Sequence, residues 1–341
     1  MHALRGVAPI AVVSDAPLVD ALENGRDFAL STAGMSDARR PRMSTTTSST
    51  HWLDGDPHST KRQVRRFIER RPALTYFFLT VLISWTGISL VVGPGAFPLR
   101  WERFERLGLV IYVAAWAGPT LACLLLTGLI DGRAGLRDLV SRMRRWRVAP
   151  HWYVIALVLS PATKAATLGV LSVFSSEYRP AIFASAHKIE TVLLAVAIGL
   201  LFGFFEELGW TGFAIPKLRL RHGIVSTGLV VGLVWGAWHF PLFWENDSFS
   251  AALPLAILLA RLFAWLPPFR VLMVWLYDRT GSLLPPMLMH ASLVATQLIF
   301  SPGRLTGTTL VVDLLVWCAA VWVALGVIFV ADRGAWNPTR G

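Results

Sequence analysis

The sequence has few charged residues and few cysteines for its length, and both shortages limit what the protein can be. Among 341 residues, 16% are charged and 54% are hydrophobic, whereas a soluble domain carries about 25% charged residues. The two cysteines, Cys123 and Cys318, both fall in apolar stretches. They can build neither a disulfide framework nor a zinc knuckle, and we interpret each as a small buried hydrophobic residue. An ordinary soluble domain is therefore excluded.

Long apolar runs are present instead. Several are about 20 residues long, the length that crosses a ~30 Å hydrocarbon core as a helix. The sequence predicts an all-α, polytopic membrane protein with about eight transmembrane helices. The predicted spans are residues 74–95, 107–130, 152–174, 191–213, 224–243, 252–277, 282–300 and 309–331.

Positive charge is distributed unevenly between the connections. The formal net charge is +11. With a cytoplasmic N-terminus, and with residues 1–60 left aside, eighteen lysines and arginines lie in cytoplasmic segments against six in outer ones. This asymmetry follows the positive-inside rule and predicts that both termini are cytoplasmic. The charge is thus explained by topology and by contact with the lipid bilayer, and we expect no nucleic-acid partner. Residues 135–147 alternate arginines with apolar residues at helical spacing, which predicts an interfacial helix that anchors the topology or, alternatively, docks a substrate.

The N-terminal segment differs in composition from the rest. Residues 1–60 are polar, contain a Ser/Thr run and show no sustained periodicity, so they predict a disordered extension. Met35 or Met43 as the true start is a further hypothesis. The sequence predicts one membrane domain over residues 61–335, with its most informative motifs within 200–296.

Two adjacent glutamates, Glu206 and Glu207, stand at the end of a long apolar run. A carboxylate near the bilayer centre costs about 2.5–3.5 kcal/mol even on a lenient insertion scale, so such residues indicate function. His239 and His290 lie in neighbouring spans. If the spans around the turn at residues 222–223 are antiparallel, Glu206 and His239 lie level with each other. His290 lies nearer the start of its span, so its depth agrees less well.

Glu206, His239 and His290 are the residue types of a water-activating peptidase inside an intramembrane cavity. A carboxylate removed from water holds a proton more tightly, which makes it a workable general base near neutral pH. One imidazole can position a water or protonate a leaving amine, and a second can donate to an oxyanion. The same three side chains would equally suit a zinc ion, but no His-Glu-x-x-His segment occurs, so a metal is not demanded. Packing histidines and a transporter's proton relay or ion site are the alternatives.

Three motifs carry a resemblance to a known family. Glu206-Glu207-Leu-Gly-Trp, Trp235-Gly-Ala-Trp-His239 and His290-Ala-Ser resemble the motifs of the CPBP intramembrane proteases, which include type II CAAX prenyl proteases and bacteriocin-processing or abortive-infection-like proteins. The resemblance covers about residues 190–300. It implies that Glu206 activates water with His239, that Glu207 supports it, and that His290 belongs to the oxyanion-binding side. Members are commonly labelled metalloproteases.

Two positions depart from the family pattern. Thr211 stands where the family has an arginine four residues after the second glutamate, and Val294 stands where an asparagine often follows the third-motif histidine. Positions i and i+4 share a helix face, so the usual arginine would neutralise Glu207. We hypothesise that Arg261, a charge within the sixth span, supplies this countercharge.

Other polar and aromatic residues of the spans also need a place. Lys164, Arg270 and Asp313 could snorkel to the interface, form ion pairs or line a cavity, and structural pairing is the favoured interpretation for each. The tryptophans that flank the motifs are expected to wall the cavity: Trp210, Trp235 and Trp238.

The sequence as a whole predicts an intramembrane endopeptidase of the bacterial inner membrane that cleaves a peptide or a membrane-protein tail. The bacterial setting follows from the family's distribution and from the presence of only four lysines, which is typical of a GC-rich genome. A non-catalytic immunity or scaffold protein is the first alternative and a proton-coupled transporter the second. Neither the substrate nor the oligomeric state is predicted.

Overall fold

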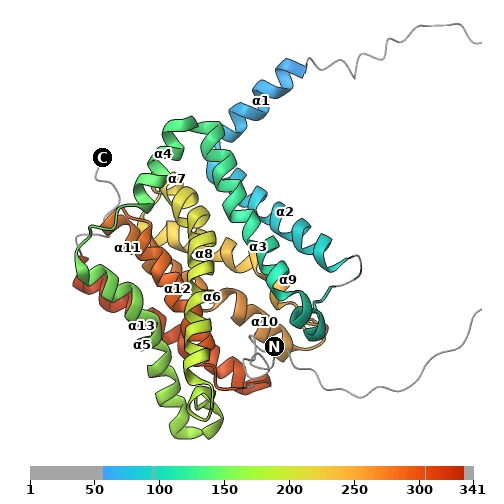
Figure 1. Cartoon of the computed structure of the whole chain (residues 1–341), viewed down its shortest axis with the longest axis vertical. Helices are drawn as coiled ribbons and strands as arrows, with labels where there is room; N and C mark the ends of the chain where they lie inside the picture. Colours follow the sequence, from blue (N-terminus) through green and yellow to red (C-terminus); the bar gives the residue numbers. More distant parts are fainter. Residues whose placement is uncertain (1–56, 94, 96, 304, 334–341) are drawn as a thin grey trace, which may run out of the picture. The chain divides into compact units, whose positions relative to one another are not determined.

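The computed structural model describes residues 57–93, 95, 97–303 and 305–333, and in these ranges all regular structure is helical. Residues 1–56 of the predicted extension, with both hypothetical start sites, and residues 334–335 of the predicted domain lie outside the described residues, whereas 57–60 form the first turn of a helix. Residues 57–66 belong to a separate unit, and residues 67–333 belong to the unit that carries the predicted motifs. The helices (Figure 1) are α1 (Pro57–Arg70), α2 (Pro72–Val92), α3 (Trp101–Ile130), α4 (Gly132–Met143), α5 (Pro150–Phe174), η2 (Ser176–Tyr178), η3 (Ala181–Phe183), α6 (Lys188–Gly209), η4 (Trp210–Ala214), α7 (Ile215–Arg219), α8 (Ile224–Trp238), α9 (Phe240–Phe243), α10 (Ala252–Phe263), α11 (Leu266–Thr280), α12 (Leu284–Ile299) and α13 (Gly307–Ala331).

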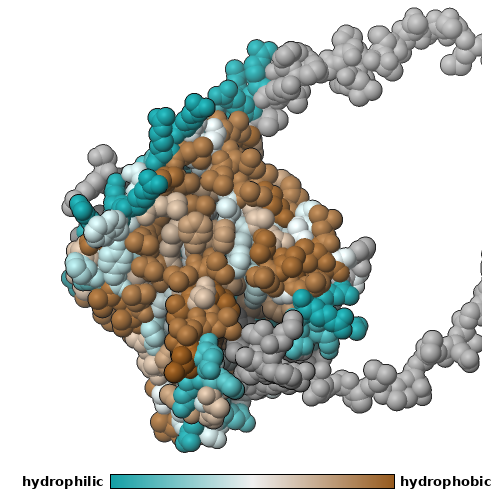
Figure 2. Space-filling view, viewed as in Figure 1, coloured by the Kyte–Doolittle hydropathy of each residue, from teal (hydrophilic) through white to brown (hydrophobic). Residues whose placement is uncertain are grey.

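The predicted spans correspond to apolar helices of the structure. Six helical stretches are long and apolar enough to cross a membrane, and α8 and α12 are shorter apolar helices. Together they account for the eight predicted spans, and the chain is a multi-pass membrane protein. Many large apolar side chains point outward, such as Leu90, which is 79% exposed, and hydrophobic side chains cover much of the face in Figure 2. Such a surface is expected where the surrounding solvent is lipid.

The sixth predicted span is divided rather than continuous. Residues 252–277 were expected as one helix, but α10 ends at Phe263 and α11 begins at Leu266. Pro267 and Pro268 occupy the first turn of α11. Because proline has no backbone N–H to donate to the preceding turn, it is tolerated in a helix's first turn and interrupts a helix interior.

Glycines permit two close helix crossings that build the site. A Cβ added to Gly199 or Gly203 of α6 would lie 2.3 Å from the Ala291 carbonyl oxygen or 2.2 Å from that of Met287, both on α12. Small residues four apart let membrane helices approach at backbone distance. Glu207 continues this spacing, which brings it to the face of α6 that meets α12.

A second crossing joins α8 to the α10–α11 segment. Gly228, Gly232 and Gly236 repeat at intervals of four, and added Cβ atoms would lie 2.4, 2.5 and 2.0 Å from backbone atoms of α11 and α10. The backbones of these helices are therefore in direct contact. This crossing holds Trp235 of α8 beside Arg270 of α11, whose guanidinium carbon lies 4.0 Å from the ring centroid.

Candidate active site

Glu207 is a fully buried carboxylate whose oxygens are both engaged. Arg270 Nη1 donates to them at 2.9 and 2.7 Å, and His290 Nδ1 lies 2.8 Å from Oε1. The Thr211 hydroxyl also donates to Oε2. The Glu207 and Arg270 side chains are both 0% exposed. With its oxygens so fully bonded, Glu207 is suited to hold its neighbours in place and poorly suited to take up a proton.

Glu206 is equally buried but differently bonded. Its Oε2 accepts a hydrogen bond of 2.8 Å from the indole Nε1 of Trp235. Its Oε1 is buried and has no hydrogen-bond partner among the described residues. A buried carboxylate oxygen without a partner is uncommon and demands an explanation, such as a catalytic role or a water. Glu206 is thus the member of the pair with capacity to accept a proton.

Trp235 is the side chain that connects the polar groups. Its ring centroid lies 5.5 Å from that of His239 and 5.2 Å from that of His290, while its nitrogen holds Glu206. Its own carbonyl oxygen lies 2.8 Å from His239 Nδ1. Since each imidazole uses Nδ1 for these contacts, Nε2 of each ring is the atom left for a ligand or water.

A cavity of about 360 Å³ opens at the two histidines. His239, His290 and Trp235 line it, while the rest of the wall is mostly apolar. Val294, one turn beyond His290 on α12, also lines it and contributes no hydrogen-bond donor. Glu206 and Glu207 are not among the lining residues and lie behind Trp235 and His290. A pocket of this size and character is typical of small-molecule and peptide sites.

The predicted residues therefore meet at one place. From its position near the start of its span, His290 was expected to agree less well in depth with the other residues. Its ring nevertheless contacts Glu207 directly. The expected turn is present, since α8 begins at Ile224 directly after Gly223. Of the flanking tryptophans, Trp235 lines the cavity, whereas Trp210 and Trp238 are buried against each other with ring centroids 6.0 Å apart.

The hypothesis that Arg261 neutralises Glu207 is wrong. Arg270 occupies that role, and Arg261 instead pairs with Glu245. The reason is the glycine crossing, which presses the middle of α11 against α8 while Arg261 remains on α10. The spacing of Gly228, Gly232 and Gly236 was the sequence signal that could have identified α11 as the neighbour.

Lys164 and Asp313, for which pairing was expected without a named partner, form an ion pair with each other, with Lys164 Nζ 2.8 and 2.7 Å from the two carboxylate oxygens. Both residues line the same cavity as His239 and His290. The Lys164 ammonium also lies 5.0 Å from the ring centroid of Trp317. The cavity is otherwise largely apolar. The Lys164–Asp313 pair adds two charged side chains to its wall, and their charges cancel.

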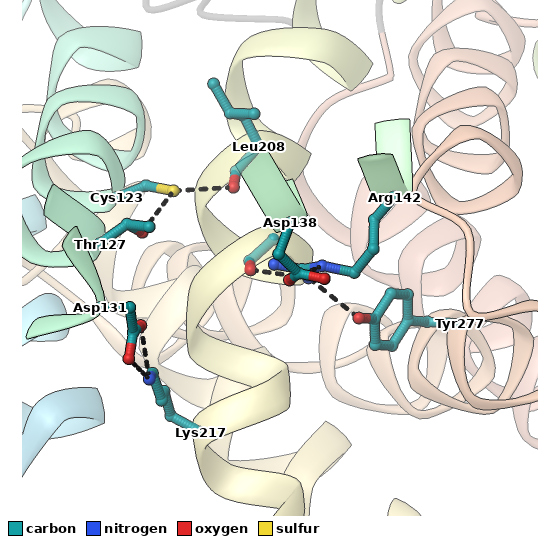
Figure 3. A network of polar contacts seen from close by, with 9 residues as sticks. Cys123, Thr127, Asp131, Asp138, Arg142, Leu208, Lys217 and Tyr277 are labelled. Atoms are coloured by element: carbon teal, nitrogen blue, oxygen red, sulfur yellow. Dashed lines mark hydrogen bonds and ion pairs between the residues drawn. The ribbon is translucent and has the colours of Figure 1, made fainter. Parts of the chain in front are cut away.

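A polar network holds the turn that follows the glutamates (Figure 3). The helix after Gly209 widens into a π-turn, η4, before α7, and π-turns are frequent at functional sites. Arg142 of α4 donates from Nη1 to the Gly212 carbonyl oxygen and to the Tyr277 hydroxyl, both at 3.0 Å. On the other side of the turn, Cys123 Sγ donates to the Leu208 carbonyl oxygen at 3.2 Å. Cys123 is thus a buried packing residue, as predicted.

The residues present do not form a ready metal centre. Among the described residues, no three histidine, cysteine, aspartate or glutamate side chains are grouped as metal ligands. Glu207 is bonded by Arg270 and His290, so its oxygens are not free for a metal. Zinc remains a sequence prediction, and hydrolysis by an activated water requires no metal-bound step.

Comparisons with known proteins agree with the motifs. Residues 188–296 match the family described as type II CAAX prenyl endopeptidase Rce1-like. The chain is also 22% identical over 179 residues to a protein named CAAX prenyl protease 2 from Methanococcus maripaludis. That similarity spans 52% of this chain and 63% of the relative.

Proposed function

The family match and the match to the archaeal relative both support membership of the CPBP family, and on this premise we propose that this protein is an intramembrane endopeptidase. The observation that carries the proposal is the difference between two adjacent glutamates. Glu207 has its oxygens bonded by Arg270, His290 and Thr211, whereas Glu206 keeps one buried oxygen without a partner among the described residues. A general base needs a carboxylate oxygen that other groups do not occupy, and within the pair only Glu206 keeps one.

The proposed reaction is direct hydrolysis by an activated water. Glu206 Oε1 takes a proton from the water, whose oxygen forms a bond to the carbonyl carbon of the peptide. Nε2 of His290 or His239, when protonated, donates to the developing oxyanion. The proton held on Glu206 then passes to the amide nitrogen as the C–N bond breaks, which releases an amine and a carboxylic acid. Glu207 and Arg270 keep the His290 ring in position throughout.

The chemistry of the cavity indicates the class of substrate. Its walls are mainly apolar, and the polar parts include the His239–His290 end and the Lys164–Asp313 pair, together with Arg261, Gln297 and Ser301. We infer a peptide or a membrane-protein tail with apolar side chains near the cleaved bond. We further propose a bacterial inner-membrane location with both termini cytoplasmic, supported by the positive-inside asymmetry of the loops.

A cleavage assay on purified protein tests the proposal. The full chain in detergent is incubated with a library of apolar peptides, including one that ends in a prenylated CAAX sequence, and products are identified by mass spectrometry. Cleavage that is lost in Glu206→Ala and His239→Ala, with folding retained, supports the enzyme. Parallel reactions with a chelator test the zinc prediction. Cleavage by both variants at the rate of the unmodified protein would contradict the proposal.

A non-catalytic scaffold or immunity protein is the second candidate, and Val294 is the observation that favours it. A valine in the cavity wall beside His290 offers no donor to an oxyanion. This candidate predicts peptide binding without product formation. The alternative that the protein is a proton-coupled transporter predicts counterflow in liposomes, also without a cleavage product.

A further inference from the structure

We propose that α4 carries a binding site for the phosphate headgroup of an anionic phospholipid. The site is a surface groove lined by Leu136, Arg137, Val140, Ser141, Arg144 and Arg145. It lies away from the cavity and plays no part in the proposed hydrolysis.

The first observation is the uncompensated charge around the groove. Two acidic residues occur within residues 131–147, and both already have basic partners: Asp131 accepts from Lys217 and Asp138 from Arg142 (Figure 3). Arg137 and Arg144 are exposed and form no ion pair with any described residue. The groove therefore presents guanidinium groups without a protein anion to neutralise them, and a guanidinium binds a phosphate through paired, charge-assisted hydrogen bonds.

The second observation is the position of the helix. α4 begins directly after α3 and precedes α5, and both of those helices are long and apolar enough to span a membrane. It therefore lies at the level where a membrane helix ends and headgroups begin. Hydrophilic side chains over α4 border the apolar surface in Figure 2. Val140, 41% exposed, and Trp146, 61% exposed, are the apolar side chains beside the arginines, so acyl chain and headgroup would both find partners.

The third observation is that the backbone at the end of α4 is hydrogen-bonded to a neighbouring segment, which holds this part of the chain in place. The Leu283 N–H donates to the Arg142 carbonyl oxygen at 3.1 Å, and the Ser282 hydroxyl donates to the Arg145 carbonyl oxygen at 2.7 Å. These bonds join the end of α4 to the turn that precedes α12. With its backbone held in place, the segment that carries the arginines needs less ordering when a ligand binds.

Native mass spectrometry of the delipidated full chain tests the proposal. Phosphatidylglycerol is titrated against phosphatidylcholine, and inorganic phosphate is added as a separate competitor. We expect preferential phosphatidylglycerol adducts that weaken about 30-fold in the double variant Arg137→Gln/Arg144→Gln. The matched control, Arg71→Gln/Arg221→Gln, removes two exposed arginines from other helix ends and should bind as the parent does.

Four results would overturn the proposal. The first is unchanged lipid binding by the groove variant. The second is an equal loss of binding in the control variant, and the third is no preference for phosphatidylglycerol over phosphatidylcholine. Displacement of the lipid by millimolar phosphate would show a simple anion site rather than a phospholipid site. Thermal unfolding of every variant verifies that the fold is intact, and no readout depends on proteolytic activity.

Discussion

Arg270 places a single nitrogen, Nη1, between both carboxylate oxygens of Glu207, at 2.9 and 2.7 Å, with neither side chain exposed. Removing one partner of a buried pair leaves an uncompensated charge and costs about 3–5 kcal/mol. Arg270→Leu should therefore lower the free energy of unfolding by that amount, measured by denaturant titration in detergent. Arg261→Leu is the control and should cost less, because its partner Glu245 is 19% exposed. Equal losses in the two variants would refute the assignment of Arg270.

The countercharge should be transferable from α11 to α6. Thr211 lies one helical turn after Glu207 and its hydroxyl already bonds that carboxylate, so an arginine there can reach the same oxygens. We expect Arg270→Leu/Thr211→Arg to recover much of the stability and cleavage lost in Arg270→Leu. The comparison variant is Arg270→Leu/Thr211→Val, which should remain impaired. A charge-restored variant no better than this one would show that the position of the cation, and not its charge alone, is required.

The indole nitrogen of Trp235 should contribute to catalysis through its hydrogen bond to Glu206, separately from the packing of its ring. Trp235→Phe keeps an aromatic ring but removes the donor to Glu206, and a bond to a charged group is worth about 1.5–3 kcal/mol. We predict a fall in kcat of about 10-fold to 100-fold with little change in KM. Trp238→Phe is the matched control, because its buried Nε1 has no hydrogen-bond partner among the described residues. Similar kinetics in both variants would contradict this role.

The α6–α12 crossing should tolerate no added side chain at Gly203. A Cβ there would lie 2.2 Å from the Met287 carbonyl oxygen, so Gly203→Ala must push the helices apart. We expect a loss of about 1–3 kcal/mol of stability and reduced cleavage, because Glu207 and His290 sit on the separated helices. Gly169→Ala, whose Cβ meets nothing within 4 Å, should be neutral in the same unfolding and activity measurements. If Gly203→Ala changes neither stability nor cleavage, close contact between α6 and α12 is not what positions the site.

Sequence alone was sufficient for the apolar helices, because hydrophobic length carries that information. It also predicted that Glu206, His239 and His290 share a cavity; the three gather around Trp235, but the cavity lining includes only the two histidines. It was insufficient for the partner of Glu207. Arg261 and Arg270 are both arginines in one predicted span, and only the break before Pro267 and the glycine crossing with α8 decide which one faces Glu207. The unequal bonding of the two glutamates likewise depends on side-chain geometry that no spacing specifies.

Single-turnover cleavage by Glu206→Gln is the most direct test of Glu206 as the general base. The amide oxygen can still accept from Trp235, so the fold should be retained while the proton acceptor is lost. We predict a rate about 10²- to 10⁴-fold below that of the parent, with peptide binding preserved. A folded Glu206→Gln protein that cleaves at the parental rate would show that Glu206 is not the residue that activates water.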